Sequence, residues 1–544
     1  MPSASYDATI IMPPMWHIRE PWTAPAYICQ ALRSKGFRVQ FLDYNIALFH
    51  ICNRLGYGHL WQDGAFFQSW IRGEMNFLTA LPDLGEIAAD VVGIRVTQTS
   101  WNVGAALAMR IRKAYPHKKI IFGGHPLFFP EEAACIPLEA ADAICKGEGE
   151  HTICEVMEKG FERIGEVAGV YVPGENGWQL TRERPMEGNL DLLPWPRFEG
   201  IDLSRYGKRF LPLMGSRGCV GRCLFCPDRY RSPGYRTRSA TNQVDELEYL
   251  SQQFEVEHFP YNDPLLNGNI KVLNEKVDEI LRRGLKVQYG GNMMVRADMP
   301  EELFPKLRKS GMSVALIGVE SGCADTLKHM RKRHTPEMAG EFIRRCHQAG
   351  IKTELNFILG FPTETEEHFQ ETCTFLRQYS PYIDAVISIM PLLVQPSDLY
   401  DQREAFGIVM QNGTEYANWC VQNGNNTLEV RLDRVQRFRQ LADDLGLLED
   451  HVMSEGTMPG MYQVPTPDRF LQNFRERFLE GADILPEERA AYQSAAKRLS
   501  ELTATASPPV GPLELAMKAV RSLKKHGVRQ SVRRGREWLA IHRR

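Results

Sequence analysis

The sequence has no hydrophobic run long enough to cross a membrane. Its longest apolar stretch, Ala385 to Val394, is broken by Ser388 and Pro391, whereas a spanning helix needs about 20 apolar residues. The N-terminal segment also lacks the basic stretch, apolar run and small-residue cleavage site of a secretory signal. We therefore expect a cytoplasmic protein.

The chain also lacks a strong net charge and internal repeats. Its formal charge is −2 over 544 residues. The last 27 residues, from Lys518, contain ten Lys or Arg and one acid, Glu537, so the rest of the chain has a charge of −11. A mildly acidic body with a basic tail is unlike a general nucleic-acid-binding protein, so we expect no nucleic-acid partner.

Disulfides are not expected, although the chain has 12 cysteines. Thiols stay reduced in a cytoplasmic protein, where clustered cysteines more often bind metal. Hydrophobic residues make up 43% of the chain and charged residues 24%. These fractions are typical of folded domains, and the length predicts about three of them.

The first part of the chain alternates between predicted strands and helices. Apolar strands are expected at 8–13, 38–43, 91–96, 119–122 and 141–144, and helices at 24–35, 103–114 and 150–160. This alternation predicts an α/β domain with a doubly wound parallel sheet, in which ligands bind outside the carboxyl ends of the strands. The candidate binding residues at those ends are Pro14, Asp43, Thr97, Thr99, Ser100, Gly123, Gly124, His125, Gly147, Glu148 and Gly149.

A hairpin and a linker separate this domain from a second alternating series. Residues 167–178 predict a hairpin with Asn176 and Gly177 in its turn, and 190–196 is typical of a linker. The series that follows has strands at 211–215, 257–262, 286–290, 313–317, 352–358 and 383–390 and helices at 242–254, 270–283, 301–310, 336–348 and 367–378. It predicts a partial (β/α)6 barrel, in which the chemistry lies at the carboxyl ends of the strands.

Strands are no longer indicated beyond about residue 425. Helices are expected at 430–448 and 469–502, before a Pro-rich break at 507–512. The expected division of the chain is 1–165 for the N-terminal domain, 166–205 for the hairpin and linker, 206–425 for the barrel, 426–506 for a mainly helical C-terminal region and 507–544 for the basic tail.

Three cysteines directly follow the first barrel strand. Cys219, Cys223 and Cys226 form a C-x3-C-x2-C array. Three thiolates can hold a [4Fe–4S] cluster and leave one iron without a protein ligand, whereas structural clusters normally take four cysteines. The alternatives are a zinc site or three unrelated core cysteines, but no further Cys or His that could complete a zinc site lies between 200 and 240.

This array resembles the signature of the radical S-adenosylmethionine (SAM) superfamily. The resemblance implies that the open iron binds SAM and that one electron cleaves SAM to a 5′-deoxyadenosyl radical. Three strand-end segments, 261–264 (YNDP), 318–321 (GVES) and 357–364 (FILGFPTE), are similar to the SAM-contacting loops of that family. The residues implied to contact SAM are Phe225, Asp263, Arg296, Glu320, Ser321 and Gly360.

Each implied contact has a specific role. Phe225 would pack on the adenine, Gly360 would let the adenine approach the backbone, and Glu320 and Ser321 would hydrogen bond to ribose or carboxylate. Arg296 would form a planar fork with the SAM carboxylate. For Asp263 and Arg296, a structural ion pair is the alternative.

The N-terminal domain resembles the cobalamin (B12)-binding domain of B12-dependent radical SAM enzymes. The similar stretches are IIMPPMW, LRSKGFRVQFLDYN, ADVVGIRVTQTS, IIFGGHP and CKGEGE, in that order. The D-x-H-x-x-G motif that places a histidine under cobalt in other B12 enzymes is absent, because Asp43 is followed by Tyr44, Asn45 and Ile46. The resemblance implies cobalamin without a lower histidine ligand, with His17 and His125 as candidate cofactor-facing residues; a domain that has lost the cofactor is the alternative.

These resemblances imply a radical SAM methyltransferase that C-methylates a small-molecule or natural-product substrate. A radical cyclase or ring-rearranging oxidoreductase that transfers no methyl group is the alternative enzyme, and a non-catalytic binding protein with the same fold is a third hypothesis. The expected partners are the small-molecule substrate and an electron donor such as flavodoxin or ferredoxin. The tail at 513–544 is expected either to contact a membrane peripherally or to be solvated.

Overall fold

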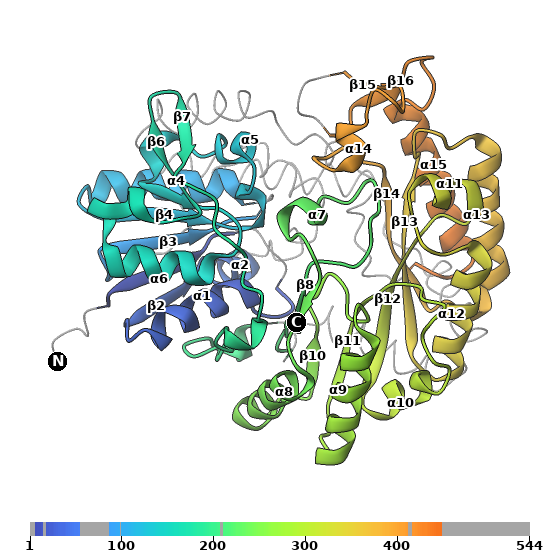
Figure 1. The fold of residues 1–544 in the computed structure, drawn as a ribbon, viewed down its shortest axis with the longest axis horizontal. Helices are drawn as coiled ribbons and strands as arrows, with labels where there is room; N and C mark the ends of the chain where they lie inside the picture. Colours follow the sequence, from blue (N-terminus) through green and yellow to red (C-terminus); the bar gives the residue numbers. More distant parts are fainter. Residues whose placement is uncertain are drawn as a thin grey trace.

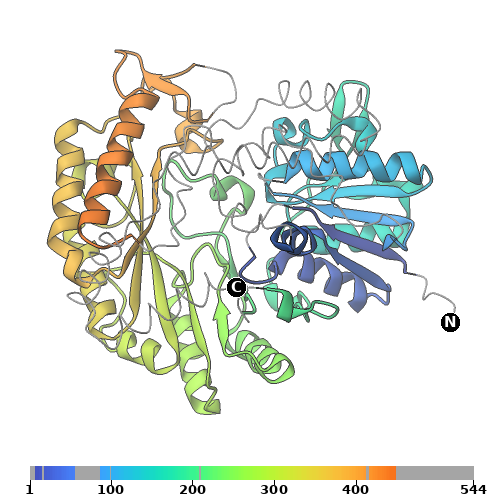
Figure 2. The same cartoon turned by 180° about the vertical axis from the view of Figure 1, so that it is seen from behind.

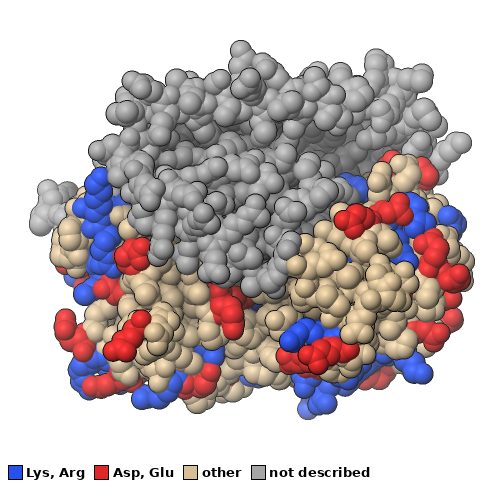
Figure 3. Space-filling view, turned by 90° about the horizontal axis from the view of Figure 1, so that it is seen from above, with Lys and Arg blue, Asp and Glu red and all other residues tan. Residues whose placement is uncertain are grey.

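The structure is a computed structural model that describes residues 6–14, 18–54, 86–97, 100–206, 210–411 and 416–448. Two α/β units lie side by side (Figure 1, and from behind in Figure 2). One is built on a seven-stranded sheet and the other on a five-stranded sheet. In the view of Figure 3, acidic and basic side chains of the described residues are interspersed on the surface.

The N-terminal unit has the strand order β2-β1-β3-β4-β5-β6-β7. Its strands are β1 (Ala8–Met12), β2 (Val39–Asp43), β3 (Val91–Arg95), β4 (Lys119–Gly123), β5 (Ala143–Cys145), β6 (Val170–Gly174) and β7 (Gly177–Leu180). The first five are parallel, and β6 and β7 add an antiparallel edge. Because β1 pairs with both β2 and β3, the strand order reverses between β1 and β3, where ligands of such sheets bind.

Apolar cores cover both faces of this sheet. On one face Ile94 and Val92 pack with α4 (Trp101–Ala114), and on the other Ile10 packs with α1 (Thr23–Ser34) and α6 (Gly149–Lys159). The remaining helices of the unit are α2 (Tyr44–Arg54), α5 (Pro130–Ala133) and short 3-10 turns. Helices on both faces confirm the doubly wound sheet predicted from the alternating sequence pattern.

The hairpin of β6 and β7 differs from the prediction by one residue. Gly174 pairs with Gly177, so the turn consists of Glu175 and Asn176 and not of Asn176 and Gly177. Gly177 has a φ of 110°, which glycine adopts without strain. The glycine is therefore needed at the start of β7, just past the turn.

The second unit is a partial barrel of parallel strands. Its sheet contains β10 (His258–Pro260), β11 (Gln288–Met293), β12 (Met312–Glu320), β13 (Lys352–Leu359) and β14 (Ala385–Pro391). The predicted strand at 211–215 is reduced to two parallel bridges, Phe210 to His258 and Leu213 to Tyr261. These bridges add a sixth segment beside β10, so the partial (β/α)6 barrel is confirmed, with a less regular first strand.

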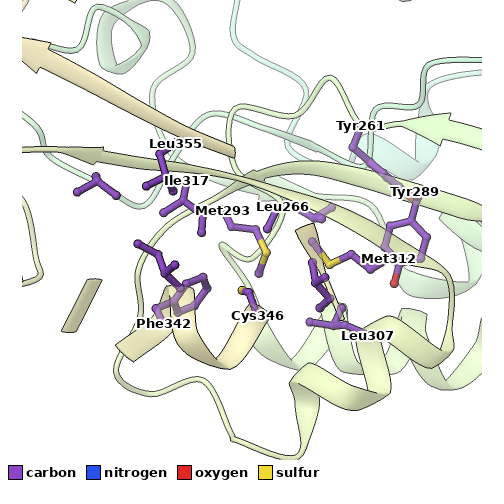
Figure 4. Packing of buried hydrophobic residues seen from close by; sticks show 14 of the residues in the cluster. Tyr261, Leu266, Tyr289, Met293, Leu307, Met312, Ile317, Phe342, Cys346 and Leu355 are labelled. Atoms are coloured by element: carbon purple, nitrogen blue, oxygen red, sulfur yellow. The ribbon is translucent and has the colours of Figure 1, made fainter. Parts of the chain in front are cut away.

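Helices cover the outside of the barrel. They are α8 (Ala240–Phe254), α9 (Ile270–Arg283), α10 (Leu303–Lys309), α11 (Ala324–His329), α12 (Pro336–Gln348), α13 (Glu366–Tyr379) and α15 (Leu428–Asp444). Figure 4 shows how Met293 and Ile317 from the strands pack with Leu307 of α10 and with Phe342 and Cys346 of α12. This continuous apolar core fixes the strands, and with them the loops at their carboxyl ends.

Short elements complete the described part of the chain. They are β8 (Ser216–Arg217), α7 (Asp228–Arg231), β9 (Arg236–Thr237), α14 (Asp398–Asp401), β15 (Ile408–Met410) and β16 (Trp419–Val421). The helix predicted at 430–448 corresponds to α15, whereas the helix predicted at 469–502 and the tail at 507–544 lie outside the described residues. Among the residues that the structure describes, no helix is both long and apolar enough to span a membrane.

Candidate functional site

The three cysteines lie in a loop between β8 and α7. This loop follows Leu213, whose bridge to Tyr261 marks the carboxyl end of the first barrel segment. Both β8 and α7 lie between the two units (Figures 1 and 2). The cysteine loop is therefore at the carboxyl edge of the barrel, on the side of the N-terminal unit.

Gly221 lies between two of the cysteine sulfurs. A Cβ atom at this position would be 3.3 Å from the Cys219 Sγ and 3.7 Å from the Cys223 Sγ. The Gly221 N–H also donates a hydrogen bond to the Cys219 Sγ at 3.2 Å. Glycine thus keeps the space between these sulfurs open, and its amide stabilises negative charge on one of them.

Burial raises the pKa of all three thiols, to about 12 for Cys226. Lys332 opposes this effect, because its positive charge lowers the pKa of Cys219 and Cys223. In the described ranges no group of three His, Cys, Asp or Glu is arranged to hold a single metal ion. Buried thiols with raised pKa values become thiolates when a metal centre replaces their protons.

Lys332 is a site residue that the sequence did not reveal. Its Nζ lies 3.2 Å from the Glu320 Oε1, and both side chains are buried. Burial lowers the pKa of Lys332, but Glu320 and Cys223 raise it, and the net result is above its usual value. A buried ammonium group therefore lies beside the cysteines, although a lysine in the basic segment 331–334 gives no sequence signal of burial.

The two predicted residues at the end of β12 have protein partners. Glu320 has a φ of 67°, and Gly318 leaves room for the Glu320 carboxylate beside Lys332. The Ser321 hydroxyl lies 3.0 Å from the Thr372 Oγ1 and accepts a hydrogen bond from the Cys323 N–H at 3.1 Å. Both residues are at the carboxyl edge of the barrel, where the sequence placed them.

Asp263 and Arg296 hold loops in this structure. The Asp263 carboxylate accepts hydrogen bonds from the Gly215 N–H and the Ser216 hydroxyl, both at 2.7 Å. Burial raises the pKa of Asp263 to about 6. Arg296 donates to the Asn267 and Gly268 carbonyls and pairs with Asp298. Arg296 thus forms an ion pair, the alternative that the sequence left open for it, whereas Asp263 fixes the start of the cysteine loop through hydrogen bonds.

Gly360 is required by a protein side chain. Its φ is 81°, and a Cβ atom there would overlap the side chain of Arg431. Arg431 is fully buried, donates to the Ala417 and Trp419 carbonyls, and lies 3.7 Å from the centre of the Trp419 ring. The side of Gly360 on which a Cβ atom would lie is therefore occupied by Arg431 of α15, and the predicted adenine contact of its backbone stays a prediction. Phe225 is half-buried and packs on an apolar cluster of Leu224, Met330, Phe361 and Leu392.

Several predicted residues shape the carboxyl edge of the N-terminal sheet. Gly124 has a φ of 144°, and a Cβ atom there would overlap the Val96 carbonyl oxygen. The Thr97 N–H donates to the Ser100 Oγ at 2.8 Å, just before α4. Asp43 accepts hydrogen bonds from the Tyr206 hydroxyl and the Ile46 N–H. The loops at the carboxyl edge of this sheet are therefore held by close backbone packing and local hydrogen bonds.

The other residues predicted at this edge have simpler surroundings. Pro14 is buried, Gly123 ends β4, and Gly147 has a φ of 73°. A Cβ atom at Gly149 would be 3.1 Å from the Ile28 Cδ1, so this glycine allows α6 to pack on α1. Thr99 and His17 lie outside the described residues.

Buried ion pairs connect this edge to the cysteine loop. Glu148 pairs with Arg217 at 3.2 Å and with Arg236 at 2.6 Å, and Glu150 also pairs with Arg217. Beyond the cysteines, Arg231 pairs with Glu132, and both side chains are 4% exposed.

His125 extends this set of interactions, since its Nε2 lies 3.5 Å from Asp228. A hydrogen bond with His125 lowers the pKa of Asp228. The cysteine loop is therefore held on both sides by carboxylates of the N-terminal unit. Of these contacts the sequence had pointed only to Glu148 and His125, and as ligand residues.

Comparison with known proteins relates part of this chain to a known superfamily. The sequence profile of the Radical SAM superfamily matches residues 213–376, which include the cysteine loop and the strands β10 to β13. This segment of the chain is therefore similar to radical SAM domains.

The two-unit fold is similar to the folds of two solved cobalamin-binding radical SAM enzymes. The structure of TsrM from Kitasatospora setae, a radical SAM methyltransferase with cobalamin and a [4Fe–4S] cluster bound, aligns with a TM-score of 0.59 and 15% identity, over 87% of this chain and 99% of that one. The cobalamin-dependent enzyme OxsB, with aqua-cobalamin and SAM bound, aligns with a TM-score of 0.53 and 16% identity, over 99% of this chain and 75% of that one. At these identities the likeness shows the fold.

Curated relatives are similar over part of their length. An uncharacterised methyltransferase of Pyrococcus horikoshii is 27% identical over 53% of this chain and 64% of its own. The anaerobic magnesium-protoporphyrin IX monomethyl ester cyclase of Rubrivivax gelatinosus is 29% identical over 44% of this chain and 45% of its own. The chain thus spans about half to two thirds of the length of these relatives.

Proposed function

We propose that this chain is a cobalamin-dependent radical SAM enzyme that methylates a carbon atom of a small molecule. The observation that carries the proposal is the position of Cys219, Cys223 and Cys226, at the carboxyl edge of the barrel and opposite the carboxyl edge of a doubly wound sheet. Two ligand-binding edges that face each other allow two cofactors to act on one substrate. The relatives that carry methyltransferase names support the same reaction.

The residues present fit a [4Fe–4S] cluster. The three cysteines supply the thiolate ligands, the open space at Gly221 separates two of their sulfurs, and Lys332 offsets the negative charge that thiolates would bring. Asp263 holds the start of the loop through Gly215 and Ser216. The three cysteines would hold the cluster at the edge of the barrel where β12 ends.

The residues of the N-terminal edge fit a large flat ligand such as cobalamin. Gly123, Gly124 and Gly147 place no side chains at the ends of β4 and β5, and Gly124 packs directly on the Val96 carbonyl. When bound, the cluster and SAM supply a 5′-deoxyadenosyl radical and cobalamin supplies the methyl group. The protein's own part is to hold the two edges together, which Arg217, Arg231 and Arg236 do through their ion pairs.

For SAM, we propose contacts with Phe225, Glu320 and Ser321. Phe225 is half-buried, so part of its ring is accessible to an adenine. Glu320 and Ser321 end β12 at the same edge as the cysteines. Asp263 and Arg296 would act indirectly, because their polar groups are used by the protein.

Labelled SAM distinguishes the candidate reactions. The chain, reconstituted anaerobically with iron, sulfide and cobalamin, would be incubated with candidate substrates, a reductant such as reduced flavodoxin, and SAM carrying a labelled methyl group. The proposal expects label in the product, with both S-adenosylhomocysteine and 5′-deoxyadenosine formed. Deoxyadenosine without S-adenosylhomocysteine would favour the radical cyclase alternative, to which the cyclase relatives point.

Matched cysteine variants provide the control. Cys223→Ala removes a proposed cluster ligand, whereas Cys346→Ala removes a buried core thiol of α12. We expect the first variant to form no deoxyadenosine and the second to retain the activity. Equal activity of Cys223→Ala and the parent chain would contradict the proposed cluster, and a chain that bound neither iron nor SAM would instead be a non-catalytic binding protein.

A further inference from the structure

Arg95, the last residue of β3, has an unusual environment. Its Nη1 is buried and has no hydrogen-bond partner among the described residues. The guanidinium carbon lies 3.5 Å from the centre of the Trp22 ring. Burial alone lowers the pKa of Arg95, to about 9, since no carboxylate contributes to the shift. Its contact in the described structure is therefore an aromatic face and not an acid.

Other buried arginines of this chain have oxygen acceptors on their terminal nitrogens, although their Nε atoms have no hydrogen-bond partner among the described residues. Arg217 and Arg231 pair with carboxylates, and Arg431 donates to three backbone carbonyls. A buried charge without a partner is strongly unfavourable, by several kcal/mol. A cation–π contact that is shielded from water offsets part of this cost, by about 2 kcal/mol. The position of Arg95 therefore calls for an acceptor that the described residues do not provide.

Arg95 lies where a doubly wound sheet binds ligands. β3 neighbours β1, and the strand order reverses between them. The chain after β1 leads to Trp22 at the start of α1, on one face of the sheet, whereas the chain after β3 leads to α4 on the other face. A ligand crevice is expected between these two connections, next to the contact of Arg95 with Trp22.

The same place adjoins the barrel. Thr23, next to Trp22, accepts a hydrogen bond from the Asn262 Nδ2 at 2.8 Å. Asn262 follows β10 at the carboxyl edge of the barrel. Arg95 is therefore near the junction of the two edges, and a ligand in the crevice would present its polar groups to it.

We propose that Arg95 is a ligand-binding residue whose guanidinium donates hydrogen bonds to an oxygen acceptor on cobalamin, its phosphodiester or a peripheral amide. This inference rests on the proposed function, because it takes cobalamin as the occupant of the N-terminal edge. Trp22 holds the guanidinium flat and ready for this contact. A charged arginine without an acid is a better anion site than one already neutralised.

The matched variants are Arg95→Met and Arg112→Met. Methionine keeps the length and apolar character of the side chain but removes the charge. Arg112 is in the same unit, at the end of α4, and pairs with Asp142 at 2.7 Å beside the amino ends of β4 and β5. Arg112→Met is therefore the control: it removes an arginine that has an acidic partner and lies away from the proposed ligand site.

Binding would be followed by the visible spectrum of cobalamin and of cobinamide, which lacks the phosphodiester and nucleotide. We expect Arg95→Met to weaken cobalamin binding roughly 10- to 100-fold, as for a lost hydrogen bond to a charged group. Weakened binding of cobalamin with unchanged binding of cobinamide assigns the contact to the phosphodiester, and weakened binding of both assigns it to a ring amide. Arg112→Met is expected to bind both compounds as the parent chain does.

The melting temperature of the cobalamin-free chain is the second readout. We expect Arg95→Met to melt at the same or a higher temperature than the parent, because an unpartnered buried charge is removed, and Arg112→Met to melt lower. Equal cobalamin and cobinamide binding by the parent and Arg95→Met would overturn the inference and leave the proposed function intact. A parent chain that binds no cobalamin would overturn both.

Discussion

Buried arginines on the two sides of the domain junction differ in their partners. On the barrel side, Arg217 and Arg231 bracket the cysteine loop and pair with Glu150 and Glu132 of the N-terminal unit. On the sheet side, Arg95 stacks on Trp22, and among the described residues no acid lies beside it. The first group holds the protein together before any ligand binds. On our proposal, a ligand completes the interactions of Arg95.

The first way to test this comparison is to break a paired site. Arg217→Met leaves Glu150 buried and without its ion-pair partner. Removal of one member of a buried pair typically lowers stability by about 3–5 kcal/mol, and we expect a loss of this size in the apparent free energy of unfolding, measured with denaturant. The iron content should fall as well, because the loop before Cys219 loses its anchor.

An exposed pair provides the control for this variant. Arg163 pairs with Glu166 on the surface, where their side chains are 60% and 51% exposed. Water screens such pairs, so Arg163→Met should leave both unfolding and iron content unchanged. If Arg217→Met unfolded like Arg163→Met, the ion pairs would not anchor the loop.

Two basic residues near the cysteines, Lys332 and His334, can be compared in the same way. Lys332 is paired with Glu320, whereas His334 is buried beside the Val319 backbone and the charge of Lys332. Burial and the charge of Lys332 lower the pKa of His334 to about 4. Since this value is below that of an unfolded histidine, the unfolded chain takes up a proton first as the pH falls.

The stability that His334 contributes is therefore complete above about pH 6.5 and is lost as the pH falls towards 4. From the size of the pKa shift, the loss is on the order of 2–3 kcal/mol. His334→Phe removes the titrating group, so its stability should depend less on pH in this range than that of the parent. Parallel pH profiles of unfolding for the two chains would contradict this account.

Gly221→Ala is expected to have the smallest effect on folding. One methyl group here would require the flexible end of Met294, 3.0 Å away, to shift slightly, and it would lie within 4 Å of two cysteine sulfurs. We expect a melting temperature close to that of the parent and a clear loss of bound iron. Gly188→Ala is the control, because a Cβ atom there meets no atom within 4 Å, and iron retained in Gly221→Ala would show that the space between the sulfurs is not needed.

Much of the fold could be predicted because local signals agree with it. The helices α9 and α12 have the predicted bounds, and each begins after a capping residue, Asn269 or Thr335, whose side chain accepts a backbone N–H. The strand before the cysteines was overestimated, since it is held by two bridges and not by a full ladder. Local apolar character alone does not determine how many hydrogen bonds a strand makes.

The site could be predicted less completely because its key contacts are distant in sequence. The spacing of the cysteines is local and was visible, but the pairing of Arg217 with Glu150 joins segments that only the fold brings together. The sequence predicted Gly360 as a contact of adenine, but it did not reveal that Arg431 also requires a glycine at this position. Arg95 gave no signal, because a buried charge is recognised only when its surroundings are known.

The most direct test of the central claim is the iron and acid-labile sulfide content of the chain after anaerobic reconstitution, measured together with the electron paramagnetic resonance spectrum of the reduced protein. The account predicts about four iron and four sulfide per chain, a spectrum that changes when SAM is added, and loss of both in Cys223→Ala but not in Cys346→Ala. A parent chain without iron, or one whose cluster survives in Cys223→Ala, would contradict it.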